Sequence, residues 1–166
     1  MQTVSHKSTL YLFTDASVNP QKKIGFGAYI LLTEEEVSSA MMSKNDVKSR
    51  KFENTSSTKL ELETLLWALG KINLQNHKLT IFTDCQNIIG LNDRRERFEQ
   101  NNYLTGKNKL IKNHELYKEF FKITDSIEFE LVKVKGHKKN KDKNTIDNIF
   151  TLVDQASRDA LRELLF

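Results

Sequence analysis

The sequence predicts a mixed α/β fold in which antiparallel and parallel strands share one sheet. Two apolar, strand-like segments lie close together near the start of the chain, separated by a polar turn that contains Pro20. From Ser57 onward the apolar residues take a helical spacing, and the later strand-like segments are separated by helical ones. Strands joined by a short turn pair antiparallel, whereas strands joined through a helix run parallel, so both kinds of pairing are expected.

The first half of the chain supplies three predicted strands. Leu10–Asp15 and Gly25–Leu32 are rich in aliphatic and aromatic residues and can pair as a hairpin. The polar stretch that follows, TEEEVSSAMMSKND, is interpreted as a loop, and a weaker strand is predicted over Lys48–Asn54.

A helix is predicted from Ser57, over Thr58–Lys71, because serine and threonine residues suited to an N-cap precede a stripe of leucines. The stripe consists of Leu62, Leu65, Leu66 and Leu69. Trp67, beside the stripe, is interpreted as a core residue. The short apolar segment Leu79–Asp84 predicts the next strand.

The second half alternates helices and strands. A short helix and a basic helix near Asn92–Gln100 are followed by a loop through Gly106. Asn113 can cap a further helix, whose predicted inward positions are Leu116, Tyr117, Phe120 and Phe121. Strand Ile127–Val134 precedes a lysine-rich loop, and a final helix is predicted from about Ile149. Its predicted inward positions are Val153, Ala156, Ala160 and Leu164.

The composition predicts one domain over residues 1–166. The 166 residues are 38% hydrophobic and 29% charged, and no repeat or flexible linker interrupts them. Cys85 is the only cysteine, which excludes an internal disulfide and a thiolate metal cage. No apolar run approaches the roughly 20 residues that cross a bilayer, and the N-terminus lacks the apolar stretch of a secretory signal. We therefore expect a soluble, cytoplasmic protein without a membrane partner.

Positive charge is concentrated in two late segments. Residues 94–112 hold six basic and two acidic side chains, and residues 133–143 hold six lysines and one aspartate. Because the whole chain carries +4 and these segments carry +4 and +5, the remainder carries −5. A solvated basic surface is the plain interpretation of the segments, and nucleic-acid binding is the functional one.

Two aspartates end similar strand sequences, LYLFTDAS and LTIFTDCQ. If the two strands are parallel neighbours, the carboxylates of Asp15 and Asp84 emerge at the same edge of the sheet. A turn or helix-cap role is the alternative for either aspartate alone. The repetition of Thr-Asp after both strands favours a shared site.

Two further carboxylates can reach that site. Glu61 lies in the first turns of the predicted helix and can lean toward the sheet, whereas Glu63 points elsewhere because i and i+2 do not share a helix face. A helix-dipole role is the alternative for either glutamate. Asp154 lies beside the inward residue Val153 in the final helix, where an ordinary exposed aspartate is the alternative.

Clustering of these four carboxylates requires protonation or a bound cation. Two like charges about 4 Å apart repel by roughly 4 kcal/mol at an effective dielectric near 20. Oxygen ligands without His or Cys favour Mg²⁺ or Mn²⁺, and two ions about 3.5–4 Å apart suit in-line cleavage of a phosphodiester. The basic segments would then hold a nucleic-acid backbone.

Five short motifs occur in order across nearly the whole chain. They are TDAS at 14–17, KLELETLLWAL at 59–69, FTDCQ at 82–86, VKGH at 134–137 and VDQASRDAL at 153–161. In this combination the chain resembles the type-1 (bacterial-type) ribonuclease H family. The resemblance implies a ribonuclease H-like five-stranded mixed sheet flanked by helices. It also implies Mg²⁺-dependent cleavage of the RNA strand of RNA–DNA hybrids, leaving 5′-phosphate and 3′-hydroxyl ends.

The resemblance implies a set of site residues. The metal-binding carboxylates, for two Mg²⁺ ions with Mn²⁺ as a substitute, match Asp15, Glu61, Asp84 and Asp154. His137 matches a mobile-loop histidine associated with proton handling or product release. The segment from Arg94 to Asn113 resembles a basic handle that binds the DNA strand. The predicted substrate contacts are Gln86, Asn19, Ser57, Thr58, Arg94, Arg95, Lys107, Lys109 and Lys112. No obligate protein partner is implied, so we expect a monomer.

The chain departs from the family pattern in three places. Ala16 stands where the family often has glycine, and Ser57-Thr58 where it often has Asn-Asn; both regions bear on recognition of RNA sugars. The gap of 17 residues from His137 to Asp154 is longer than expected, which makes Asp147 a competitor for the last carboxylate. The helix context VDQASRDAL favours Asp154, with Asp147 as a helix cap.

Two other functions stay open from the sequence. One is a non-catalytic basic nucleic-acid-binding module whose acids are structural, which predicts salt-dependent binding without metal-dependent cleavage. The other is a related nuclease that acts on DNA.

Overall fold

The structure, a computed structural model, describes residues 7–136, 138–139, 141 and 143–165. Its centre is a five-stranded mixed sheet, as predicted, in the order β3-β2-β1-β4-β5. The strands are β1 (Ser8–Asn19), β2 (Ile24–Thr33), β3 (Lys48–Glu53), β4 (His77–Thr83) and β5 (Glu128–Lys133). The pairs β1–β2 and β2–β3 are antiparallel, whereas β1–β4 and β4–β5 are parallel. The short turn and the helical crossovers therefore produce the pairings expected of them.

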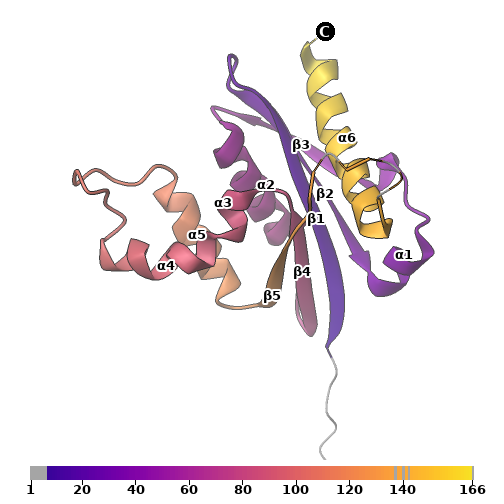
Figure 1. Ribbon diagram of the computed structural model, residues 1–166, viewed down its shortest axis with the longest axis horizontal. Helices are drawn as coiled ribbons and strands as arrows, with labels where there is room; N and C mark the ends of the chain where they lie inside the picture. Colours follow the sequence, from indigo (N-terminus) through magenta and orange to yellow (C-terminus); the bar gives the residue numbers. More distant parts are fainter. Residues whose placement is uncertain (1–6, 137, 140, 142, 166) are drawn as a thin grey trace, which may run out of the picture.

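Helices cover both faces of the sheet. They are α1 (Glu34–Ser39), α2 (Ser57–Lys71), α3 (Gln86–Ile89), α4 (Leu91–Gln100), α5 (His114–Thr124) and α6 (Thr145–Leu165), with a 3₁₀ turn at Lys44–Asp46. Figure 1 shows α2 to α5 on one side of the sheet and α6 with α1 on the other. The α4 end, with the loop that follows it, projects furthest from the sheet. None of the helices in the described part of the chain is long and apolar enough to cross a membrane.

Two hydrophobic cores result, one on each face. The larger lies between the sheet and the α2 and α5 side, and the leucine stripe of α2 is buried in it as predicted. Trp67 is half-buried and packs against this core. The smaller core joins Phe13 and Phe82 of the sheet to Val153 of α6. Alternate residues of β1 therefore face different cores, so that Phe13 and Asp15 belong to the α6 side.

Several expected element bounds are wrong. The polar stretch interpreted as a loop contains α1, because Thr33 and Glu36 form a capping box that supports a short helix. Strand β1 continues to Asn19, paired with Ile24, so Asp15 lies within a strand rather than at its end. The final helix begins at Thr145 rather than near Ile149.

One predicted core position of α6 is also wrong. Leu164 is 43% exposed, because the last turn of α6 extends past the sheet.

Close contact between β2 and α2 depends on Gly27. A Cβ atom built on Gly27 would lie 2.1 Å from Oγ1 and 2.8 Å from Cβ of Thr64, and Thr64 is fully buried. A Cβ on Gly25 would lie 2.3 Å from Cδ2 of Leu60. The absence of side chains at these two positions lets α2 lie directly on the strand, which brings the start of α2 close to β1.

We expect Gly27→Ala to destabilise the protein by about 1–3 kcal/mol, because the added methyl group overlaps a packed helix. Gly70→Ala is the matched control: no atom lies within 4 Å of its added Cβ, and the exchange lies in the last turns of α2. It should stabilise the protein by about 0.5–1 kcal/mol through helix propensity. Urea unfolding followed by circular dichroism measures both, and equal stabilities for Gly27→Ala and the unchanged protein would contradict the close-contact argument.

Candidate metal centre

Three carboxylates from separate parts of the sequence meet at one point. Asp15 lies in β1, Glu61 near the start of α2, and Asp84 directly after β4. One oxygen atom of each lies within 4.8 Å of the others. The strand register explains part of this arrangement: Phe13 pairs with Phe82 in the parallel ladder, so the two aspartates, each two residues further on, follow side by side on the same face.

The cluster selects Glu61 over Glu63, as the sequence predicts. Glu63 points away from the cluster and accepts a hydrogen bond from Oγ1 of Thr55 at 2.5 Å. The two glutamates on one helix therefore have different surroundings, which follows from their spacing.

Burial makes the negative charge of the cluster costly. Asp15 is only 4% exposed, and its pKa is raised by burial first and then by the charges of Glu61 and Asp84. The pKa of Glu61 is likewise raised by burial and by Asp84, although hydrogen bonds to the Asp15 side chain and the Ala16 backbone partly oppose the rise. Oε2 of Glu61 is buried and has no hydrogen-bond partner among the described residues. A buried carboxylate oxygen without a partner, beside two other carboxylates, suits coordination of a divalent cation with hard oxygen ligands.

Asp154 lies at the border of this cluster and not among the three grouped carboxylates. Its side chain is 27% exposed, and Oδ1 forms an ion pair with Nε of Arg158, one helical turn later, at 2.9 Å. Hydrogen bonding and charge from Asp154 nevertheless contribute to the raised pKa of Asp15. Asp154, the fourth predicted carboxylate, therefore lies on the more exposed side of the cluster, where it pairs with Arg158.

Asp147, the competing carboxylate, has a structural role. Its Oδ2 accepts from the backbone N–H of Asn144 at 3.1 Å, and Asn144 in return accepts from the Asp147 backbone N–H. Nζ of Lys138 donates to the same oxygen at 3.0 Å. Burial raises the pKa of Asp147, but these hydrogen bonds and the lysine charge outweigh it, so that the pKa is lowered overall. The prediction that Asp147 caps the final helix is consistent with these contacts.

The remaining predicted residues lie around the centre. Gln86 begins α3, next to Asp84, and its Oε1 accepts from Nζ of Lys133 at 2.6 Å. Ser57 and Thr58 are exposed in the first turn of α2, and Asn19 closes the β1–β2 turn by accepting from two backbone N–H groups. His137 lies outside the described residues.

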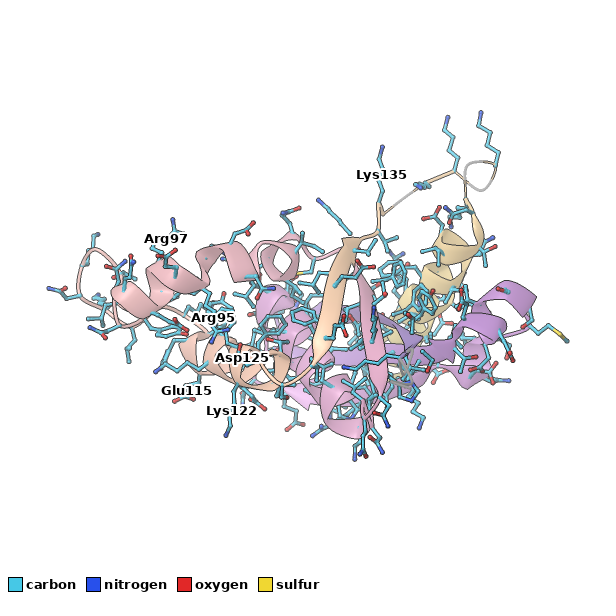
Figure 2. The ribbon with its side chains drawn as sticks, turned by 90° about the horizontal axis from the view of Figure 1, so that it is seen from below. Arg95, Arg97, Glu115, Lys122, Asp125 and Lys135 are labelled. Atoms are coloured by element: carbon cyan, nitrogen blue, oxygen red, sulfur yellow. The ribbon has the colours of Figure 1, made fainter. Side chains whose placement is uncertain are left out.

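The basic handle divides into anchoring and exposed cations. Arg94 donates to the backbone carbonyls of Gly90 and Asn87, and Arg95 pairs with Glu99 and Asp125. These two guanidinium groups thus bind the protein itself. The three predicted lysines of the handle, all exposed, are Lys107, Lys109 and Lys112. Sequence reasoning did not single out Arg97, which is also exposed and points away from the α5 side chains Glu115 and Lys122 (Figure 2).

Arg158 and Gly27 were also missed. The i,i+4 spacing of Asp154 and Arg158 was the available signal for the first, because such pairs face each other on a helix. For Gly27, the sequence offered only a glycine within an apolar strand as an indication.

A mixed sheet that gathers carboxylates from β1, α2 and the end of β4 defines an α/β domain with a candidate divalent-metal centre. The chain belongs to the RNase H family, because the RNase H family model matches residues 7–160.

Relatives with this name are distant in sequence. The Ribonuclease H of Thermoanaerobacter sp. (strain X514) is 27% identical over 101 residues, which span 60% of this chain and 64% of the relative's length. The Ribonuclease H of Treponema denticola is 24% identical over 143 residues, spanning 78% of this chain and 86% of the relative. A chain from the structure of the foamy viral protease-reverse transcriptase in complex with dsDNA has the same fold, with a TM-score of 0.61 at 16% identity over 95% of this chain and 97% of that one.

The carboxylate cluster predicts a pH dependence of stability in the absence of metal. The folded-state pKa values of Asp15 and Glu61 are raised, so the folded protein binds more protons than the unfolded chain between the ordinary carboxyl pKa and the raised values. Stability is therefore fully present below the ordinary carboxyl pKa and is lost as the pH rises. We expect the free energy of unfolding in EDTA to fall by about 2 kcal/mol between pH 5 and pH 8.

Urea unfolding at both pH values, with and without Mg²⁺, tests this. Added Mg²⁺ should restore stability at pH 8, and Asp15→Asn combined with Glu61→Gln should flatten the pH slope. Asp125→Asn is the control, because the pKa of Asp125 is lowered by hydrogen bonding to Arg95 and this exposed group titrates below the window. A slope that persists in the double variant would show that other groups cause it.

Proposed function

We propose that this chain is a metal-dependent endonuclease that hydrolyses the RNA strand of RNA–DNA hybrids. Membership of the RNase H family supports the substrate class. The observation that carries the proposal is the group formed by the buried Asp15 with the half-buried Glu61 and Asp84, whose oxygens lie within 4.8 Å of one another. Repulsion makes three clustered carboxylates unfavourable in the protein alone, and bound cations would neutralise them.

The residues present fit a two-ion site for Mg²⁺, with Mn²⁺ as a substitute. Asp15, the most buried of the three, would serve both ions, Glu61 and Asp84 would help to hold one of them, and Asp154 would help to hold the other. Divalent ions held there supply Lewis-acid stabilisation of the charge that develops on a scissile phosphate. The products we expect carry 5′-phosphate and 3′-hydroxyl ends.

Other groups of the protein would admit the substrate and handle protons. Water and the phosphate backbone would enter on the side of Asp84 and Asp154, which line an open cavity, whereas Asp15 is only 4% exposed. We propose His137 for proton handling or product release. All the carboxylates come from one chain, so a monomer suffices for the site.

Cations on one side of the molecule would hold the hybrid. Arg97 of α4 and Lys135, just beyond the end of β5, project to the same side in Figure 2. The exposed handle lysines extend this positive surface beyond α4. We propose that the handle holds the DNA strand, while the carboxylates receive the RNA strand, whose 2′-hydroxyl groups distinguish it from DNA.

We expect Asp15→Asn and Glu61→Gln each to reduce cleavage of an RNA–DNA hybrid by at least about 100-fold, because each removes a ligand of the cations that stabilise the reacting phosphate. Glu63→Gln is the matched control on the same helix and should cleave as the unchanged protein does. Gel assays with hybrid, double-stranded RNA and double-stranded DNA, each with Mg²⁺, Mn²⁺ or EDTA, provide the measurement.

The same assays decide between this function and its rivals. Salt-dependent hybrid binding without cleavage under any metal would reduce the protein to a binding module. Cleavage of double-stranded DNA in preference to the hybrid would show that the protein is a nuclease that acts on DNA. Full Mg²⁺-dependent activity of Asp15→Asn would refute the assignment of the centre.

A further inference from the structure

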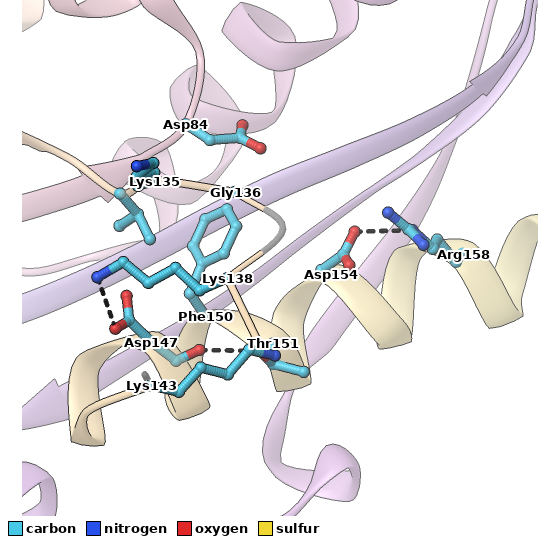
Figure 3. A pocket seen from close by; sticks show the side chains of 11 residues that line it. Asp84, Lys135, Gly136, Lys138, Lys143, Asp147, Phe150, Thr151, Asp154 and Arg158 are labelled. Atoms are coloured by element: carbon cyan, nitrogen blue, oxygen red, sulfur yellow. Dashed lines mark hydrogen bonds and ion pairs between the residues drawn. The ribbon is translucent and has the colours of Figure 1, made fainter. Parts of the chain in front are cut away.

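A second feature lies against the carboxylate cluster: a cavity of about 250 Å³ between the chain that follows β5 and the first turns of α6. Asp84 and Asp154 line it on the side of the candidate metal centre, and Phe150 forms part of its floor (Figure 3). Gly136 brings the backbone close, since a Cβ built on it would lie 3.8 Å from Oδ2 of Asp84. The cavity and the metal centre therefore share a wall.

The lining of this cavity is rich in cations. The basic side chains that line it are Lys135, Lys138, Lys143 and Arg158, and the acidic ones are Asp84, Asp147 and Asp154. We call the part formed by Lys135, Lys138, Lys143 and Thr151 the lysine pocket. Asp84 and Asp154 are assigned to cations in the metal centre, so only Asp147 remains to balance the charge of the pocket.

Asp147 is already used by other groups. Its Oδ2 accepts from Nζ of Lys138 and from the backbone N–H of Asn144, which fixes it within the helix cap. Nζ of Lys143 donates to a neutral partner, Oγ1 of Thr151, at 2.9 Å. Among the described residues, neither Lys143 nor Lys135 lies within ion-pair distance of a carboxylate.

A half-buried ammonium group that donates to a hydroxyl, and whose charge reaches Asp147 without a direct ion pair, favours a further anion. Lys143 is half-buried, and desolvation makes an unpaired charge unfavourable unless an opposite charge approaches. Lys135 is exposed at the mouth and points outward (Figure 2), where it can attract a polyanion at longer range. The pocket is thus suited to an anionic group that arrives as part of a larger ligand.

We propose that the lysine pocket binds a phosphate of the strand that is cut, close in sequence to the scissile phosphate. This inference rests on the proposed function and adds a substrate contact to it. The shared wall supports the choice of strand: a backbone with one phosphate at Asp84 and Asp154 must continue past that wall, and the lysine pocket is the neighbouring cationic surface. The turns of α6 that precede Asp154 form part of the floor of the pocket.

The experiment measures hybrid binding separately from cleavage. In an Asp15→Asn background, which keeps the hybrid intact, the affinity is measured by fluorescence anisotropy from about 50 to 300 mM salt. Lys143→Gln should weaken binding by about fivefold near 0.1 M salt and reduce the slope of log affinity against log salt by about one. Lys143→Arg keeps the charge and should keep the slope.

Two further variants control for local misfolding and for a general loss of positive charge. Lys135→Gln alters an exposed side chain outside the ion pairs and should also lower the slope, so the result does not depend on the fold around Thr151. Lys78→Gln is the control of equal charge, because Lys78 pairs with Glu128 at the opposite end of β4. It should leave the slope unchanged.

Hybrids with a single neutral methylphosphonate identify the strand. A methylphosphonate at one position of the RNA strand near the cleavage point should lower the affinity of the protein that retains Lys143. The same methylphosphonate should not change the affinity of Lys143→Gln. An unchanged salt slope in Lys143→Gln overturns the proposal, as does sensitivity confined to the DNA strand.

Cleavage measured without the Asp15→Asn change separates this proposal from the proposed function. Lys143→Gln should raise KM more than it lowers kcat. If Lys143→Gln cleaves with unchanged KM and Mg²⁺ dependence, the pocket assignment fails and the nuclease stands. If the unchanged protein cleaves no hybrid, the nuclease fails, and the binding slopes still show whether Lys143 contacts a phosphate.

Discussion

The structure is organised around one electrostatic constraint: three carboxylates are held together where water cannot fully solvate them. Two like charges about 4 Å apart repel by roughly 4 kcal/mol at an effective dielectric near 20, and burial adds to this cost. The fold opposes the repulsion with rigid elements. Parallel pairing of β1 with β4 brings the two aspartates together, and the glycines of β2 admit α2 with Glu61. Packing energy in the two cores therefore keeps in place a group of charges that would otherwise separate.

The distribution of positive charge complements this centre. The two segments at 94–112 and 133–143 carry the excess of basic residues, and Arg97 of the first and Lys135 of the second project to the same side of the molecule (Figure 2). A long polyanion can therefore contact cations of both segments. The acidic and basic parts of the chain are separate in sequence and adjacent in space, which is the arrangement expected when a phosphate backbone and metal ions share a site.

The sequence predicted the sheet and the carboxylates because both depend on local periodicity. Asp15 and Asp84 follow the same apolar strand pattern. Helix geometry separates Glu61 from Glu63, and the resemblance of the KLEL register to the family motif assigns Glu61. The start of α6 was not predictable in this way, since the polar run before Ile149 becomes helical through the reciprocal hydrogen bonds of Asn144 and Asp147. The internal partners of Arg94 and Arg95 could not be predicted from the sequence for a related reason. Arg95 reaches Asp125, which lies 30 residues away, so only the tertiary structure shows that its charge is used internally.

The two aspartates of α6 show how the same side chain can serve a structural or an exchangeable role. Asp147 and Asp154 both lie in this helix, and the long gap of 17 residues between His137 and Asp154 put them in competition in the sequence. Asp147 is buried and accepts hydrogen bonds from the Asn144 backbone, at the start of the helix, and from Nζ of Lys138, so a cation could recruit it only by breaking these contacts. Asp154 has a single ion pair to an arginine that is 53% exposed, a contact worth only about 0.5 kcal/mol. A divalent cation can displace that arginine at little cost, and this difference supports Asp154 as the fourth ligand.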